Sequence, residues 1–307
     1  LEDGCGRFRV CQFRLMNGPT EASSIATILR KLEDIIEENR NIRVWNFSFG
    51  AREEIEENYI SVIGAELDRL QYKYDVIFVI SGSNATMSGN PLKLGAPADS
   101  LNALVVNSVN ANGEAASYSR RGPVLSFFTK PDISYFGGDV DRKINVWGCN
   151  GLEADQGTSF AAAWISRKVA FLIYYMNLPR EVAKAILIDS AAGWRTTDFD
   201  RNQIGFGVVP IRVEEVLQSQ EDEIRFILSG TCTAYDTYTY KLPVPLVDSK
   251  YPYYARATLC YFPEGERWQG VDYTQTELDL HFGRLIKKSR RDPKTNKIRT
   301  TVGIKSI

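Results

Sequence analysis

Residues 76–84 read Val-Ile-Phe-Val-Ile-Ser-Gly-Ser-Asn, and they indicate the fold more strongly than any other stretch of the chain. The first five residues are all apolar, which is typical of a strand buried on both faces in a parallel sheet. The next four are small or polar, as expected where such a strand ends and the chain turns. Residues 103–109, Ala-Leu-Val-Val-Asn-Ser-Val, form a second run of this kind. Two such strands predict a sheet with helices on both sides.

Amphipathic helical patterns alternate with strand-like runs in the first half of the chain. Apolar residues recur at helical spacing over residues 21–39 and over residues 53–72, so we expect each segment to be a helix with one buried face. The runs at residues 7–15 and 44–49 are expected to be strands. The resulting β-α-β-α order predicts an α/β fold with a parallel sheet and helices on both faces.

The middle of the chain begins with loops and continues with helices. Residues 119–157 are punctuated by Gly and Pro, which is typical of turns and loops. Two helices are then expected, at residues 158–177 and 179–191. The second of them begins with Pro179, a residue that is well suited to a first helical turn.

Near residue 218 the composition changes, and this change predicts a domain boundary. The sequence becomes rich in Tyr, Thr, Val and Phe, which favour strands. The expected strands are residues 224–228, 231–242, 254–262 and 277–285. We therefore expect an α/β domain over residues 1–218 and a small antiparallel β-sandwich domain over residues 219–307.

Composition limits the classes of partner and cofactor. An apolar fraction of 44% and a charged fraction of 24% are ordinary for a globular protein, and the net charge of −1 argues against nucleic-acid or membrane partners. No apolar run approaches the roughly 18 residues that span a bilayer. Without a metal-ligand cluster or a phosphate-binding loop, we expect neither metal nor cofactor. Five widely spaced cysteines without a Cys-x-x-Cys pair indicate reduced thiols in a cytoplasmic protein.

Two polar residues stand where they could perform chemistry. Ser159 lies in Gly-Thr-Ser-Phe-Ala-Ala (157–162) at the start of an expected helix, where a serine is either a nucleophile or part of an ordinary helix cap. Asn84 follows the buried strand and is either an oxyanion donor or a turn residue. A serine nucleophile needs a base, and the single histidine, His281, lies far downstream in an alternating stretch that indicates a structural role.

Seven segments, taken together and in this order, resemble the subtilases, the subtilisin-like serine peptidases. They are VWNFSFG (44–50), VIFVISGSNAT (76–86), GAPA with ALVVNSV (95–98 and 103–109), SYSRRGP (117–123), KPDI (130–133), GTSFA (157–161) and GFGVV (205–209). Each match is weak alone, but the ordered set extends from about residue 10 to residue 218. The resemblance implies a subtilisin-like fold and a serine endopeptidase that acts on proteins or peptides.

The resemblance also implies roles for individual residues. Ser159 would be the nucleophile, and the Asn84 side-chain amide would stabilise the oxyanion together with the Ser159 backbone N–H. Two segments would flank the cleft and hold the substrate strand. They are Ser48, Phe49 and Gly50, and Ser81, Gly82 and Ser83.

The family's Asp-x-Gly strand and His-Gly-Thr helix would precede the expected strand at residues 7–15. We therefore expect the catalytic Asp and His to lie in a segment that is missing from this chain, so that the chain alone is inactive. An N-terminal fragment or self-association would then cover the exposed sheet edge.

Two departures from the family pattern leave a second interpretation open. Ala163 and Trp164 stand where the family has Pro-His, and Tyr135-Phe136-Gly137 stands where Ala-Pro-Gly follows the KPDI segment. The two aromatic residues are expected to narrow the specificity pocket. The alternative function is a pseudoprotease, or a peptide-binding module without catalysis.

Overall fold

A computed structural model describes residues 3–16, 24–85, 92–192, 200–242, 248, 255–281, 283–291 and 296–306. The chain divides into two compact units, Leu1–Gln275 and Thr276–Ile307. Some sequence-based expectations fall outside the described residues, namely the first three residues of the expected helix at 21–39 and residues 86, 254 and 282.

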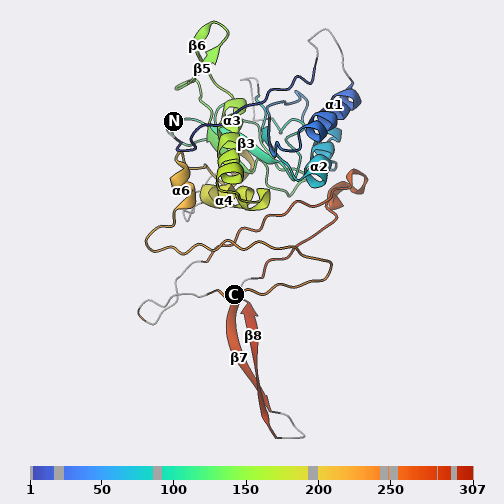
Figure 1. The fold of residues 1–307 in the computed structure, drawn as a ribbon, viewed down its shortest axis with the longest axis vertical. Coiled ribbons are helices and arrows are strands. Elements are labelled where there is room, and N and C mark those ends of the chain that lie inside the picture. Colours follow the sequence, from blue (N-terminus) through green and yellow to red (C-terminus); the bar gives the residue numbers. More distant parts are fainter. Residues whose placement is uncertain are drawn as a thin grey trace. The chain divides into compact units, whose positions relative to one another are not determined.

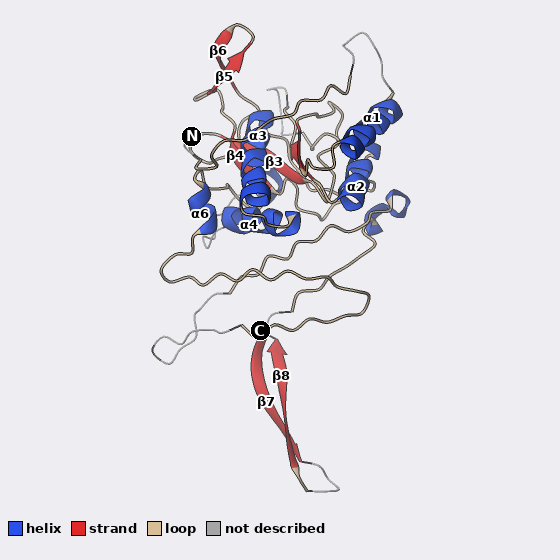
Figure 2. Cartoon of the chain, viewed as in Figure 1, coloured by secondary structure: helices blue, strands red, loops and turns tan. Residues whose placement is uncertain are grey.

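A four-stranded parallel sheet forms the centre of the first unit (Figures 1 and 2). Its strands are β1 (Val44–Phe47), β2 (Ile77–Ser81), β3 (Leu104–Val109) and β4 (Ile133–Phe136), and they lie in that order across the sheet. The three strands expected from apolar runs are confirmed, with ends that differ by two residues or fewer. β4 begins at the last residue of the KPDI segment, in a region where the sequence predicts a loop.

Helices cover both faces of this sheet, as predicted. On one face, Phe78 and Ile80 of β2 pack in the cluster formed with α1 (Ile25–Glu38) and α2 (Val62–Tyr74). On the other face, Ile77 and Val79 pack in the cluster formed with α3 (Thr158–Ala170) and α4 (Arg180–Ala192). Successive residues of a strand point to opposite faces, so a strand between two helical layers must be apolar throughout.

The expected strand at residues 7–15 is wrong, because residues 3–16 form no strand. This segment is held by side-chain contacts instead. The Phe13 ring lies 5.6 Å from the Trp45 ring, and the Arg167 guanidinium lies 4.8 Å from the centre of the Phe8 ring. The alternating apolar pattern therefore occurs here without the backbone pairing that defines a strand.

The second helix begins at Val62, not at the expected residue 53. The Ser61 Oγ accepts a hydrogen bond from the Gly64 N–H at 3.0 Å and so caps the helix. Asp99 in turn binds the Ser61 backbone N–H at 2.6 Å and its hydroxyl at 2.8 Å. Residues 53–60 are outside the helix, and the Ile55 N–H donates to the Leu94 carbonyl.

The helix expected at residues 158–177 is α3 followed by a π-helical turn, η1 (Phe171–Tyr175). A hairpin of β5 (Ile144–Gly148) and β6 (Gly151–Asp155) lies in the region expected to be loop. The shorter helices are α5 (Arg201–Ile204), α6 (Val213–Leu217) and η2 (Arg267–Asp272).

The C-terminal antiparallel sheet is present only in part. The second unit contains the hairpin of β7 (Gly283–Arg291) and β8 (Ile298–Ser306). No strand occurs in the described parts of the first three expected strands, or over residues 277–281. Aromatic and β-branched residues favour an extended backbone, but a strand also needs a hydrogen-bonded neighbour. The domain boundary near residue 218 stays a prediction, while the compact units divide at Gln275.

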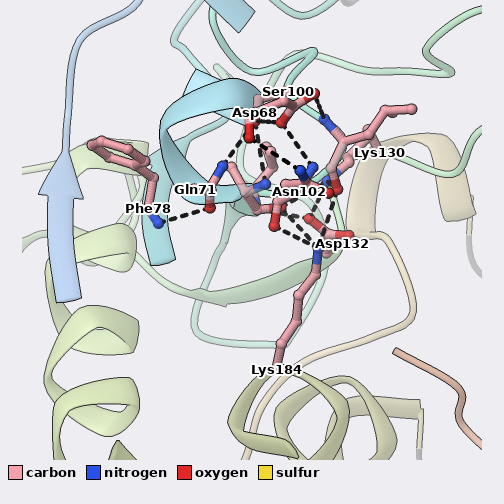
Figure 3. Close-up of polar contacts among 11 residues, drawn as sticks. Asp68, Gln71, Phe78, Ser100, Asn102, Lys130, Asp132 and Lys184 are labelled. Atoms are coloured by element: carbon pink, nitrogen blue, oxygen red, sulfur yellow. Dashed lines mark hydrogen bonds and ion pairs between the residues drawn. The ribbon is translucent and has the colours of Figure 1, made fainter. Parts of the chain in front are cut away.

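A buried polar network joins α2 to the loop before β3 (Figure 3). The Asp68 carboxylate accepts hydrogen bonds from the backbone N–H groups of Leu101 at 3.0 Å and Asn102 at 2.9 Å. It also accepts hydrogen bonds from the hydroxyls of Ser100 and Tyr273. Burial raises the pKa of Asp68, although all four hydrogen bonds favour the charged form.

Two lysines contact the same loop. The Ala103 carbonyl accepts hydrogen bonds from Lys130 at 2.8 Å and from Lys184 of α4 at 3.2 Å. Lys130 also forms a buried ion pair with Asp132 at 2.6 Å, and burial lowers the pKa of Lys130 to about 8. Asp132 accepts a hydrogen bond from the Val105 N–H at 2.7 Å, so the network reaches the first residues of β3.

A carboxylate of α1 links it to α2, and its titration gives a test of the fold. Glu33 accepts hydrogen bonds from Lys73 at 2.8 Å, from Arg69 at 2.5 Å and from Tyr74 at 3.0 Å. The Lys73 hydrogen bond is the largest cause that lowers the pKa of Glu33 to about 2, and Arg69 and Tyr74 act in the same direction. The folded-state pKa therefore lies below the ordinary value of 4.5.

We expect Glu33→Gln to lower the free energy of unfolding by about 1 kcal/mol at pH 7. Because the folded-state pKa is depressed, this stabilisation is present above about pH 4.5 and is lost as the pH falls toward about 2. Urea unfolding across this range measures the difference. Glu38→Gln, at an exposed position of the same helix, is the control. A constant difference between pH 7 and pH 2 would contradict the prediction.

Candidate active site

Ser159 lies in the first turn of α3, directly after the buried residues Gly157 and Thr158. Gly157 is the N-cap residue and provides no side chain to bind the free N–H groups of the first turn. Neither the Oγ nor the backbone N–H of the half-buried Ser159 makes a hydrogen bond to another described residue. The helix start therefore presents a free hydroxyl and a free N–H side by side.

Asn84 follows β2 and is held against the start of α3. Its Oδ1 accepts hydrogen bonds from the Thr158 backbone N–H at 3.0 Å and from the Thr158 hydroxyl at 2.8 Å. A backbone N–H can only donate, so this contact fixes which side of the amide is the oxygen. The Nδ2 group lies beside Gly157, where an added Cβ would be 3.2 Å from it. The structure thus brings Asn84 next to the Gly-Thr-Ser turn.

Ser81 is the last residue of β2, and Gly82 and Ser83 follow it. The Gly82 N–H donates to the Val106 carbonyl at 2.9 Å, and a Cβ on Gly82 would lie 2.0 Å from the Asn107 Oδ1. Only glycine fits at position 82, because any side chain there would collide with the Asn107 side chain. Ser83 has a positive φ of 69° and is buried, and its Oγ has no hydrogen-bond partner among the described residues.

Ser48, Phe49 and Gly50 follow β1 and lie beside this segment. β1 and β2 are parallel neighbours, so both strands end at the same edge of the sheet. A Cβ on Gly50 would lie 2.5 Å from the Ser83 Oγ, which shows how closely the two ends approach. Ser48 and Gly50 are exposed, and Phe49 is half-buried. Ligands of parallel α/β sheets bind at this carboxyl edge.

The SYS segment (117–119) fixes the surroundings of Asn84, a role that the sequence left unassigned. The Ala85 N–H donates to the Tyr118 carbonyl at 2.7 Å. Ser117 donates its N–H and its hydroxyl to Asp139, both at 2.7 Å. Burial alone would raise the pKa of Asp139, but the hydrogen bonds from Ser117 and Val140 lower it below its usual value. Burial raises the pKa of Tyr118 to about 12, so its hydroxyl stays protonated.

Arg120 is a second residue that sequence reasoning missed. Its buried guanidinium donates to the Arg52 carbonyl at 2.6 Å and to the Ala51 carbonyl at 3.4 Å. It therefore holds the loop that follows Gly50. Arginine is rarely buried unless it is paired, so residue type alone gave no reason to place it here. Its position in the SYSRRGP segment was the only available signal.

Two expectations from the sequence change with the structure. Tyr135 does not line a surface pocket, because it packs into the core beneath α3, with its ring 6.5 Å from that of Trp164. Phe136 is only partly buried, and the Arg142 guanidinium lies 5.9 Å from the centre of its ring. His281 was expected in the strand at residues 277–285. It is instead exposed and outside any strand, and it belongs to the second compact unit.

No metal centre is found in the described part of the chain, since no three His, Cys, Asp or Glu side chains converge there. Across the same residues, no helix has both the length and the apolarity needed to cross a bilayer. The five cysteines form no disulfide. At the sheet edge, Ser159 presents its hydroxyl and its backbone N–H, and Asn84 presents its Nδ2 group.

Comparison with known proteins identifies the family. The profile of the subtilase family matches residues 8–208, which is more than half of the chain. The self-cleaved protease domain of PatA is similar, with 19% identity over 66% of this chain and 70% of that chain, and a TM-score of 0.51. The prenylagaramide maturation protease PagA has 21% identity over 62% of this chain and 67% of that chain, and a TM-score of 0.47. No curated protein matches significantly. The chain belongs to the subtilase family and has the α/β fold of its serine peptidases.

Proposed function

We propose that this chain carries the serine-bearing part of a serine endopeptidase site. The hydrogen bonds from Thr158 to Asn84 are the observation that supports this most strongly, because they hold a side-chain amide beside the free Ser159 hydroxyl. The Ser159 Oγ attacks the carbonyl carbon of a peptide bond, and the carbonyl oxygen becomes an oxyanion. Loss of the amine then leaves an acyl-enzyme, which water hydrolyses.

The oxyanion is stabilised by two donors. One is the Asn84 Nδ2, which has no hydrogen-bond partner among the described residues, since the Oδ1 makes both contacts with Thr158. The other is the Ser159 backbone N–H, at the positive end of the α3 dipole. Donors that are fixed before the substrate arrives stabilise the transition state without reorganisation, and each contributes about 3–4 kcal/mol.

The substrate binds as an extended strand along the edge where β1 and β2 end. Ser48, Phe49 and Gly50 form one side of the cleft, and Ser81, Gly82 and Ser83 form the other. An extended peptide can add its backbone hydrogen bonds to such an edge. The close approach of Gly50 to Ser83 supports this arrangement, because it places the two segments side by side at the same edge of the sheet.

A histidine and an aspartate from a segment outside these 307 residues complete the triad. The histidine accepts the Ser159 proton and later gives it to the leaving amine, while the aspartate orients the imidazole. His281 is the single histidine of the sequence, and it does not stand in a segment that resembles the family's His-Gly-Thr motif, which supports an outside source. The chain alone is then inactive, and its partner is the N-terminal fragment or a second copy. Five unpaired cysteines agree with a cytoplasmic location.

The same observation favours a second candidate, a peptide-binding module without catalysis. The compact unit that carries Ser159 contains no histidine, so it cannot supply a histidine base of its own. A pseudoprotease would retain the cleft and the Asn84 donor and would hold a peptide without cleaving it. Activity of the complete polypeptide, with the upstream segment attached or added, distinguishes the two candidates.

Ser159→Ala is the first test. In the complete polypeptide we expect this substitution to abolish cleavage of a fluorogenic peptide, because no acyl-enzyme can form. The rate of fluorescence release measures the loss, and Ser166→Ala, on the same helix, is the control. Unchanged turnover by Ser159→Ala would refute the assignment. Peptide binding without cleavage by the unsubstituted polypeptide would favour the binding module.

Asn84→Ala tests the oxyanion donor. We expect kcat to fall by about 10²–10³ while KM changes little, because the donor acts on charge that develops only in the transition state. Steady-state kinetics on the fluorogenic peptide separate the two constants. A large rise in KM with an unchanged kcat would assign Asn84 to substrate binding.

Thr158→Val tests a positioning role for Thr158. The substitution keeps the shape of this buried side chain but removes the hydroxyl that holds the Asn84 Oδ1. We expect kcat to fall about tenfold, Thr158→Ser to restore it, and the variant with both Thr158→Val and Asn84→Ala to be no slower than Asn84→Ala alone. Additive losses in that combined variant would show that Thr158 acts independently of Asn84.

A further inference from the structure

The β5–β6 hairpin carries an exposed apolar pair. Trp147 and Leu152 lie opposite each other across the two strands, with exposed fractions of 84% and 62%. Side chains alternate between the faces of a strand, so Asn145 and Ala154 share this face with them. Glu153 and Asp155 lie on the opposite face. One face of the hairpin is thus partly apolar and open to solvent.

The root of the hairpin is fixed next to Ser159. Only Gln156 and Gly157 separate β6 from α3, and the Gly157 N–H donates to the Gly137 carbonyl at 3.0 Å. Two backbone hydrogen bonds between Asp139 and Arg142 close the turn that leads into β5, and Ser117 binds the Asp139 carboxylate. The hairpin therefore has a fixed starting point beside the first turn of α3, and it projects outward from there (Figure 1).

The order of the strands puts the hairpin and the cleft segments at different ends of the same sheet edge. Residues 48–50 follow β1 and residues 81–84 follow β2, whereas the hairpin follows β4. Asn84, bound to the start of α3, lies between them. A polypeptide bound across this edge would have one arm at the ends of β1 and β2, and its other arm would pass toward the hairpin.

The hairpin also has free backbone edges. Among the described residues, β5 and β6 pair only with each other. Residues 152–155 of β6 are all exposed, while Ile144 and Val146 of β5 are half-buried. The outer edge of β6 is therefore the more accessible one, and it leads directly to Ser159. A two-stranded hairpin is only marginally stable in water, so a third strand would also stabilise it.

We propose that this hairpin binds polypeptide substrates at a site separate from the cleft, an inference that rests on the proposed peptidase function. An extended substrate segment pairs with the outer edge of β6, on the side of the scissile bond away from residues 48–50. Alternate residues of this segment face Trp147 and Leu152, which favour a large apolar side chain. The intervening residues face Glu153 and Asp155, which favour Lys or Arg.

Binding by a chain with Ser159→Ala tests the proposal without cleavage. The probe is fluorescein-labelled β-casein, an unfolded protein, and fluorescence anisotropy measures its Kd. We expect Trp147→Ala with Leu152→Ala to weaken binding by about tenfold or more, as truncation of an apolar anchor does. Trp268→Ala is the matched control, since Trp268 is 81% exposed on η2. We expect this control to bind as tightly as the parent chain.

A second variant and an activity assay separate the possible failures. If the double alanine variant loses its thermal transition, Trp147→Thr with Leu152→Thr repeats the test with a polar residue that favours strands. In the active polypeptide, we expect the hairpin variant to cleave a short peptide at the unsubstituted rate and to cleave casein more slowly. If the polypeptide hydrolyses neither substrate but casein binding still depends on the hairpin, the peptidase function is contradicted and the hairpin proposal is not. If hydrolysis is normal and casein binding does not depend on the hairpin, the hairpin proposal is contradicted and the peptidase function is not.

Four other results would overturn the proposal. They are no casein binding by the parent chain, an equal loss of binding in Trp268→Ala, Trp147-dependent dimerisation in sedimentation velocity, and Trp147-dependent binding to vesicles of phosphatidylcholine and phosphatidylserine. The last two would identify a second copy of the chain or a membrane as the occupant of this face.

Discussion

The buried network at the amino edge of the sheet is the constraint on which the rest of the structure depends (Figure 3). Asp68 binds two N–H groups of the loop before β3, and Lys130 and Lys184 bind one of its carbonyls. Gln71 reaches the first residues of β2 through the Phe78 N–H at 2.9 Å. A lysine left without its buried partner costs about 3–5 kcal/mol, so these contacts allow few alternatives to the observed strand register.

The strand register that is set at the amino edge determines which side chains contact one another at the carboxyl edge. Because Ser81 pairs with Val106, β2 ends where Gly82 can contact Asn107 and where Asn84 can reach Thr158. A shift of one residue would turn every side chain of β2 to the opposite face. The position of the candidate oxyanion donor is thus a consequence of packing at the other end of the sheet, about one strand length away.

The sequence predicted the parts of the fold that depend on local pattern. The apolar run at residues 76–80 can only be buried on both faces, and that requirement yields both the sheet and its two helical layers. The start of α2 could not be predicted in this way, because it depends on Asp99, which binds Ser61 from 38 residues further along the chain. The segments at 7–15 and 231–242 have strand composition, but composition does not reveal whether a neighbouring strand is present.

The candidate site was predicted unevenly for the same reason. Ser159 and Asn84 stand in recognisable motifs, so each could be named from its neighbours in sequence. Arg120 and Thr158 act through partners that are 68 and 74 residues away, and no local pattern marks such contacts. Residue type even argued against a buried arginine. The residues that position a site are therefore harder to predict than the residues that perform its chemistry.

The two edges of the sheet differ in how their carboxylates and hydroxyls are paired, although the buried Asn102 Oδ1 at the amino edge also lacks a described partner. At the amino edge, the buried carboxylates of Asp68 and Asp132 each bind two or more donors. At the carboxyl edge, the Ser83 Oγ is buried without a described partner, and Ser159 has a free N–H and a free hydroxyl. A buried polar group left unpaired costs about 1–3 kcal/mol. In the proposed function, the unpaired hydroxyl and N–H of Ser159 are the groups that a bound peptide meets.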